Sequence, residues 1–270
     1  MVAMPQLFQL PDRSGPFGSA VRSLLRGHHH VNDFELCVKA FLNRQPWSHS
    51  FERNSNGKKV HTIRFTGRPP EILESIATDA AYNLRAALDQ CSYAATQLIS
   101  PTKSNRTHFP FGDAGKVGFN VKGLGCESVT PEILAVFREF EPYAGGNAPL
   151  FSLNCLCNTN KHRFIGTTDY YGGPDTVVHS EAALPIWDGE KQQIIFRHGT
   201  PESYSEAGVN FSMLIVFDGI AEVSGRPAIP ILSGFCGVTH AIIDSAAMAR
   251  RRLGKFKQPR QPLRLDPRKA

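Results

Sequence analysis

The stretch from Pro69 to Ile99 constrains the fold of this chain most, because no glycine or proline interrupts it between Pro70 and Pro101. When successive residues are turned by about 100°, its apolar side chains fall on one helical face. That face holds Leu73, Ile76, Ala80, Leu84, Ala87, Leu88, Cys91, Ala95 and Leu98. Arg85 and Asp89 lie on the opposite, polar stripe, at a four-residue spacing that allows them to pair. The stretch therefore predicts a long helix in the core.

Helical spacing of apolar residues also recurs elsewhere in the chain. It predicts helices at Gly18–Leu42, Pro131–Phe140, Pro149–Phe164 and Ser233–Leu253. Thr130 stands before Pro131 as a typical N-cap, and proline is tolerated in a first helical turn. Between two of these helices, the segment Thr107–Phe111 brings two phenylalanines, which we expect to pack on the core as an aromatic plug.

Strand-like alternation of side chains appears before and after the helical segments. Trp47–Glu52 and Lys58–Thr66 flank Asn56-Gly57, a strong hairpin signal. Shorter runs with β-type composition follow at Thr176–Val178, Ala182–Trp187, Gln192–Arg197 and Asn210–Phe217. The sequence thus predicts an α+β fold, in which a bundle of about four helices carries an N-terminal β-hairpin and a C-terminal antiparallel sheet packed on it.

The positive charge of the chain is concentrated at its end. The net charge is +6, yet residues 250–270 hold nine Lys/Arg and one acid, which leaves 21 Lys/Arg and 23 acids elsewhere. We therefore expect a single α+β domain at residues 1–253 and a basic, disordered tail at residues 254–270. Two interpretations of the tail remain open: it binds nucleic acid, or it is a solubilising end.

Several classes of protein are excluded by what the sequence lacks. No stretch approaches 18 apolar residues and the N-terminus lacks a secretory pattern, so we expect a cytoplasmic protein without a membrane segment. No P-loop or dinucleotide-binding pattern appears, and we predict no cofactor. We also predict no metal site, because neighbouring side chains of His28–His30, or of Cys155 and Cys157, diverge on a helix. The three histidines are better interpreted as a solvated face or a kink.

Two polar clusters carry the chemistry that the sequence offers. One is Tyr82–Asp89 on the central helix and the other is Asn158–Arg163 at the end of a later helix. If the two helices pack together, a histidine and a carboxylate could transfer protons while cationic side chains hold a phosphate or a developing anion. The catalytic candidates are Arg85, Asp89, Lys161 and His162, and the substrate-binding candidates are Tyr82, Asn83, Asn158 and Arg163. The alternative is a structural network that only ties the helices together.

These clusters, NLRAALDQ from Asn83 to Gln90 and NTNKHR from Asn158 to Arg163, resemble motifs of a group of uncharacterised bacterial and phage proteins. An arginine followed at five residues by a histidine is also similar to the HEPN superfamily of helical bundles. That resemblance implies RNA binding or metal-independent RNA cleavage in a defence or stress system. The present chain departs from the pattern, since Gln90 stands where the histidine is expected and cannot act as a general base.

Three hypotheses about function follow. The first is a protein that binds or cleaves RNA, or another phosphate-bearing ligand, between the two clusters. The second is a non-catalytic interaction or scaffold module with a structural polar network. The third is nucleic-acid binding by the basic tail only. Whether the protein is an enzyme, and whether it forms a homo-oligomer, stays open from the sequence.

Overall fold

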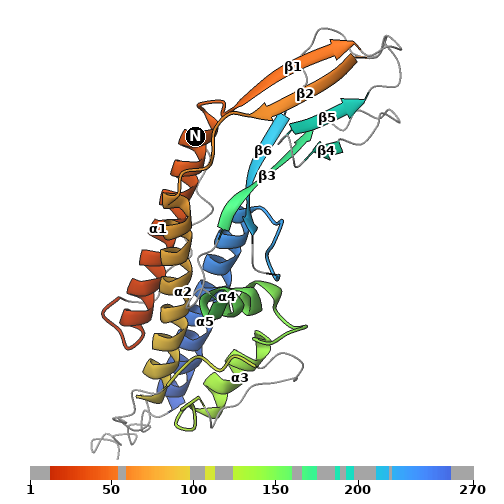
Figure 1. Cartoon of the computed structure of the whole chain (residues 1–270). Coiled ribbons are helices and arrows are strands. Elements are labelled where there is room, and N and C mark those ends of the chain that lie inside the picture. The colour runs from red at the N-terminus through yellow and green to blue at the C-terminus, as the bar shows by residue number, and fades with distance from the viewer. Residues whose placement is uncertain are drawn as a thin grey trace, which may run out of the picture. The chain divides into compact units, whose positions relative to one another are not determined.

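A computed structural model describes residues 13–53, 59–97, 107–112, 124–159, 166–174, 186–188, 193–197, 211–218 and 221–256 (Figure 1). The helices in these ranges are α1 (Gly18–Leu42), α2 (Ile72–Thr96), α3 (Pro131–Glu139), α4 (Ala148–Thr159) and α5 (Ala228–Phe256). The strands are β1 (Trp47–Arg53), β2 (Lys59–Phe65), β3 (Gly166–Pro174), β4 (Ile186–Asp188), β5 (Gln193–Arg197) and β6 (Phe211–Asp218). The fold thus combines helices with antiparallel strand pairs, as the α+β prediction requires at the coarse level.

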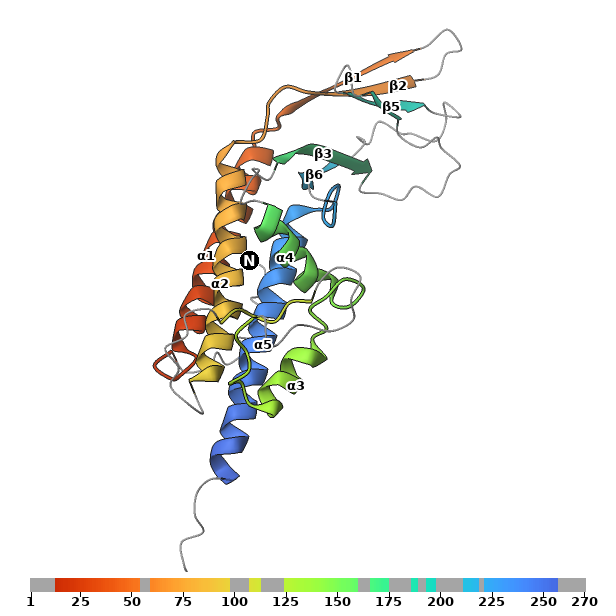
Figure 2. The same cartoon turned by 60° about the horizontal axis from the view of Figure 1, so that its bottom comes forward.

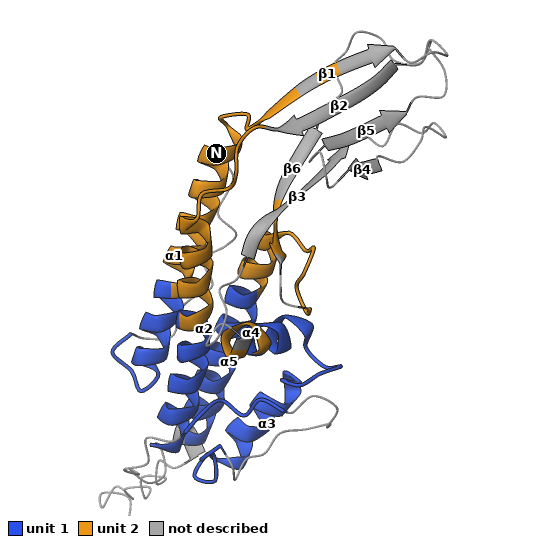
Figure 3. Ribbon diagram, viewed as in Figure 1, with its two compact units in different colours: residues 1–26, 83–154, 235–270 blue, residues 27–82, 155–234 orange. Residues whose placement is uncertain are grey.

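The chain forms two compact units (Figure 3). Unit 1 consists of Met1–Arg26, Asn83–Asn154 and Phe235–Ala270, and unit 2 consists of Gly27–Tyr82 and Cys155–Gly234. The boundaries fall within α1, α2, α4 and α5, so each of these helices contributes residues to both units. The predicted single domain, and the predicted packing of a sheet on the helical bundle, stay predictions.

The core helix predicted from the proline-free stretch is α2, which begins at Ile72, just after the two prolines. Nine of its side chains on the predicted apolar face or beside it are fully buried or nearly so: Leu73, Ala77, Ala80, Ala81, Leu84, Ala87, Leu88, Cys91 and Ala95. Ile76 is the exception, because it is only partly buried. Burial of an apolar face stabilises a helix more than intrinsic propensity does, which explains why the spacing alone located this element.

The other helices differ from the predictions mainly at their ends. α1 has the predicted bounds and runs without interruption through His28–His30. α5 begins five residues earlier than predicted, since Pro230 lies in its first turn, where no backbone N–H is needed. It also continues through Gly254 to Phe256, so the predicted tail begins within this helix. The predicted end of α4 near Phe164 lies outside the described residues.

The core of unit 1 includes the predicted aromatic plug. The rings of Phe109 and Phe111 meet edge to face with centroids 4.9 Å apart. Phe109 also contacts Phe137 of α3, with centroids 5.0 Å apart. The hydroxyl of Thr130 accepts a hydrogen bond from the backbone N–H of Ile133 at 3.3 Å, and so caps α3 as predicted. Figures 1 and 2 show α1, α2 and α5 side by side in this unit.

The strands of unit 2 form two sheets. One has the order β1-β2-β5-β4, with every neighbour antiparallel. The predicted hairpin is β1–β2, in which Trp47 lies opposite Phe65. The expectation of a separate C-terminal sheet is wrong for β4 and β5, because β5 pairs with β2 and β4 pairs with β5, so that both extend the N-terminal hairpin. This pairing joins segments that are far apart in sequence, which local alternation does not predict.

The second sheet of unit 2 pairs β3 with β6. The sequence predicted β6 but not β3, whose glycines at 166, 172 and 173 are unfavourable in strands. The register shifts between Gly166 and Asp169, where β3 has one residue more than β6. The strand predicted at Thr176–Val178 lies outside the described residues.

Among the described residues, one helix is long and apolar enough to cross a membrane: α5, over Ala228–Leu253. The core helix of a soluble protein meets the same criteria, and α5 buries Leu232, Phe235, Ile242 and Ile243 inside the protein. The prediction that no segment of this chain enters a membrane stays a prediction.

Candidate functional site

The candidate site lies on unit 1 and begins with two side chains of α2. Arg85 and Asp89 are four residues apart, and Arg85 Nε lies 3.5 Å from Asp89 Oδ2. Their side chains are only 18% and 26% exposed, so this is not the solvated surface pair that a helix usually carries. Because the pair is partly buried, its charged atoms have lost water and need other hydrogen-bond partners more than the atoms of an exposed pair would.

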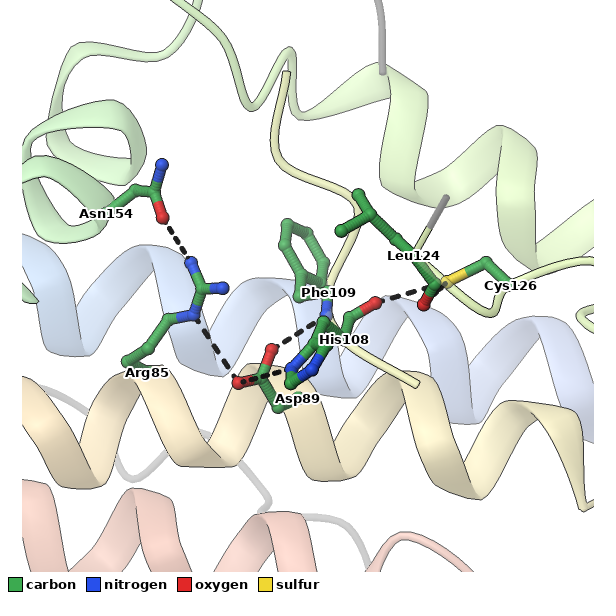
Figure 4. Close-up of polar contacts among 7 residues, drawn as sticks. All are labelled: Arg85, Asp89, His108, Phe109, Leu124, Cys126 and Asn154. Carbon is green, nitrogen blue, oxygen red and sulfur yellow. Dashed lines mark hydrogen bonds and ion pairs between the residues drawn. The ribbon is translucent and has the colours of Figure 1, made fainter. Parts of the chain in front are cut away.

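The two carboxylate oxygens of Asp89 face one backbone group and two side chains (Figure 4). Oδ1 accepts a hydrogen bond of 2.7 Å from the backbone N–H of Phe109. Oδ2 lies 3.6 Å from Nδ1 of His108, an ion pair when the imidazole is protonated. The side chain of His108 is 53% exposed and that of Asp89 is 26% exposed, so solvent reaches the imidazole more readily than the carboxylate.

The backbone that carries His108 is held on its other side by residues 124–126. The N–H of His108 donates to the carbonyl of Leu124 at 3.0 Å, and the thiol of Cys126 donates to the carbonyl of His108 at 3.1 Å. The hydroxyl of Thr107 donates to the carbonyl of Gly125 at 3.2 Å. Burial, together with the negative charges of Glu127 and Asp89, raises the pKa of Cys126 to about 12, so its thiol stays protonated.

The guanidinium of Arg85 has two further partners. Its Nη1 donates a hydrogen bond to Oδ1 of Asn154 on α4. Its central carbon lies 4.0 Å from the centroid of the Phe111 ring, a cation–π arrangement. The Nε atom is buried and makes no hydrogen bond within the described residues. Arg85 is therefore held by α4 and the aromatic plug as well as by Asp89.

The structure places part of the predicted site. It brings Arg85 and Asp89 together, but Lys161, His162 and Arg163 lie outside the described residues. Among the substrate-binding candidates, Asn83 is half-buried and Asn158 is exposed.

Tyr82, the remaining substrate-binding candidate, lies in unit 2. Its hydroxyl lies 3.5 Å from the carbonyl of Cys157, to which it donates. Burial and the neighbouring Cys157 raise the pKa of Tyr82 above its ordinary value. The hydrogen bond is a contact between α2 and α4 within this unit, so the helices that carry the two motifs touch.

Gln90, which stands where the HEPN-like pattern has a histidine, has a structural partner. Its Oε1 accepts a hydrogen bond of 3.1 Å from the hydroxyl of Ser23 on α1. Gln90 thus joins two helices of unit 1 and does not belong to the cluster around Asp89.

Two residues of the site, His108 and Asn154, are not among the candidates that the sequence predicts. The sequence places His108 only within the aromatic plug, although a histidine between Thr107 and Phe109 could be noted as a polar residue in an apolar segment. Asn154 lies one helical turn before Asn158, so extending the polar face of that helix toward its N-terminus would have found it.

The arrangement has the elements of acid–base chemistry on an anionic substrate. A histidine oriented by a carboxylate can transfer protons, and an arginine can stabilise negative charge. In the described ranges, no group of three or more His, Cys, Asp or Glu side chains is placed to hold a metal ion.

Comparison with protein-family models, with curated proteins and with solved structures gives no match for this chain.

Proposed function

We propose that the cluster of Arg85, Asp89 and His108 binds a phosphate group of RNA and cleaves the adjoining phosphodiester bond without a metal ion. The observation that carries the proposal is a half-exposed histidine 3.6 Å from a carboxylate, which itself lies 3.5 Å from an arginine. His108 takes the proton-transfer role for which the sequence offered His162. The sequence resemblance to HEPN proteins supports RNA as the substrate class.

The chemistry assigned to this cluster needs one histidine. Asp89 faces Nδ1 of His108, which leaves Nε2 to remove the proton from a ribose 2′-OH. The 2′ oxygen attacks phosphorus, the bond from phosphorus to the 5′ oxygen breaks, and the same imidazole returns the proton to that oxygen. The products are a 2′,3′-cyclic phosphate and a 5′-OH. Arg85, with five N–H donors, stabilises the charge that develops on the phosphate oxygens.

Other parts of the proposal rest on the sequence alone. Lys161 and His162 remain catalytic candidates from the sequence, and Tyr82, Asn83, Asn158 and Arg163 remain proposed RNA ligands. We also propose a cytoplasmic protein of a defence or stress system, with a single α+β domain in which the sheet packs on the helices.

A second candidate, a non-catalytic scaffold module, is favoured by one observation. Asp89 accepts the N–H of Phe109 while Arg85 lies on the ring of Phe111, so both side chains hold residues 107–112 against the helices. A network with this purpose needs no ligand. The scaffold hypothesis predicts that replacing Arg85 or Asp89 lowers the stability of the protein. It also predicts that neither the intact chain nor any variant binds or cleaves RNA.

The deciding experiment measures binding and cleavage of a fluorescent single-stranded RNA in EDTA. It compares the intact chain with His108→Ala, His162→Ala and the control His29→Ala, since His29 is also exposed and its Nε2 lies 3.5 Å from a carboxylate oxygen of Asp33. The proposal expects a cyclic-phosphate product that His108→Ala abolishes and His29→Ala leaves unchanged. Cleavage lost only in His162→Ala would move catalysis to the second motif. If the intact chain does not bind the RNA, the RNA proposal is wrong and the scaffold hypothesis is favoured.

A further inference from the structure

We infer that Asn154 is a positioning residue, which orients the guanidinium of Arg85 for a phosphate ligand. The inference rests on the proposed RNA site and deepens it, since it identifies what sets the direction of the anion-binding group. Asn154 belongs to α4, whereas Arg85 and Asp89 belong to α2, so the site depends on a second helix.

The contacts around Arg85 show which partner fixes the direction of its guanidinium. Asp89 Oδ2 lies 3.5 Å from Nε, but Nε makes no hydrogen bond in the described part of the chain. The ring of Phe111 lies 4.0 Å from the guanidinium carbon, which restricts the plane of the group but not its rotation within that plane. The directional contact is the hydrogen bond from Nη1 to Asn154 Oδ1.

Asn154 itself lies on a helical segment that is firmly held. The side chain of Asn147 caps the start of α4 by accepting a 3.0 Å hydrogen bond from the N–H of Leu150. Leu150 and Leu153 are fully buried, which anchors the same helical segment in the core. A side chain on a fixed helix can orient its partner more strictly than a side chain on a loop.

Phosphate binding requires a particular orientation of the Arg85 guanidinium. A free arginine side chain populates many rotamers, and binding a phosphate with two parallel N–H groups requires a defined plane and direction. Phe111 sets the plane and Asn154 sets the direction, so the unused N–H groups are aligned before a ligand arrives. Misplacement of such a group by about 1 Å can cost on the order of 100-fold in rate.

The test joins an orientation measurement to an RNA assay. The side-chain Nε–H signal of Arg85 is followed by ¹⁵N NMR in the intact chain, in Asn154→Leu, in Asn154→Asp and in the control Asn32→Leu on an exposed position of α1. We expect Asn154→Leu to broaden or average this signal. Asn154→Asp keeps an acceptor oxygen and should preserve the signal, as should the control.

The RNA assay is a double-mutant cycle. We expect Asn154→Leu to lower kcat by about 10- to 100-fold in the intact chain, with little change in KM, and to have no further effect in an Arg85→Ala background. Additive effects would overturn the inference, as would an Arg85 signal that Asn154→Leu leaves unchanged. If the signal responds but the intact chain neither binds nor cleaves RNA, the orientation of Arg85 by Asn154 stands and the RNA function falls.

Discussion

Oδ1 of Asp89 lies 2.7 Å from the backbone nitrogen of Phe109, and this hydrogen bond fixes residues 107–112 on α2. A carboxylate that accepts a backbone N–H makes a short, charge-assisted bond. The same carboxylate uses its second oxygen for Arg85 and His108. One side chain therefore sets both the path of the loop and the surroundings of the exposed histidine.

Replacement of Asp89 separates these two roles. Asp89→Ala leaves the N–H of Phe109 without an acceptor and should lower the free energy of unfolding by about 1–3 kcal/mol. Asp89→Asn keeps an acceptor oxygen and should cost less, yet it removes the charge beside His108. Urea unfolding measures both variants, with Glu74→Ala on the same helix as a control expected within about 0.5 kcal/mol. Equal losses in the two Asp89 variants would contradict this division.

The aromatic plug should be a major source of stability. Phe109 is fully buried between Phe111 and Phe137, so Phe109→Ala should lower the free energy of unfolding by about 3–5 kcal/mol. Chemical denaturation measures the loss, and Leu36→Ala serves as the control because Leu36 is largely exposed. A loss below about 1 kcal/mol would mean that residues 107–112 do not form part of the core.

The cap of α3 gives a prediction with a matched pair of variants. Thr130→Ala removes the oxygen that accepts the N–H of Ile133 and should cost about 0.5–2 kcal/mol. Thr130→Ser keeps that oxygen and should unfold at nearly the same denaturant concentration as the intact chain. Equal midpoints for Thr130→Ala and Thr130→Ser would show that the hydroxyl contributes nothing.

Alkaline pH should destabilise the protein through its buried thiols. The pKa of Cys126 is raised from 9.0 to about 12, chiefly by burial, so the folded protein keeps a proton that the unfolded chain releases above pH 9. Its contribution is complete below pH 9 and is lost as the pH rises toward 12, by about 1.4 kcal/mol per pH unit. Burial raises the pKa of Cys155 and Cys236 in the same direction.

Urea unfolding between pH 8 and pH 11 measures this dependence. Cys126→Ala loses a hydrogen bond at every pH, so the informative quantity is the slope above pH 9, which should be flatter than in the intact chain. Cys37→Ala, at a half-buried position of α1, is the control. An unchanged slope in Cys126→Ala would contradict the raised pKa.

The basic end of the chain gives a separate prediction about RNA. Residues 257–270 follow α5 and hold five Lys/Arg and one acid, so a chain ending at Phe256 keeps the helix and loses most of the charge of the tail. If the tail contacts phosphates, truncation should weaken RNA binding and flatten the plot of log K against log salt by about 0.7 per lost contact. An identical salt slope in both chains would exclude the tail as an RNA ligand.

The sequence by itself determined the elements whose signals are local. Apolar residues at helical spacing located α1 and α2, the Asn-Gly pair located the β1–β2 hairpin, and Thr130 with Pro131 located the start of α3. The aromatic segment 107–111 was recognised because it is apolar between polar neighbours. Each of these depends on residues a few positions apart, so the sequence contains the whole signal.

Only the tertiary structure decided which distant segments meet. It paired β2 with β5, and it brought His108 and Asn154 to the Arg85–Asp89 pair, although 69 residues separate Arg85 from Asn154. Such contacts arise from packing of whole elements, and a polar residue gives no local sign of its distant partner. The pair on α2 could therefore be predicted from its four-residue spacing, whereas the contact of His108 with that pair could not.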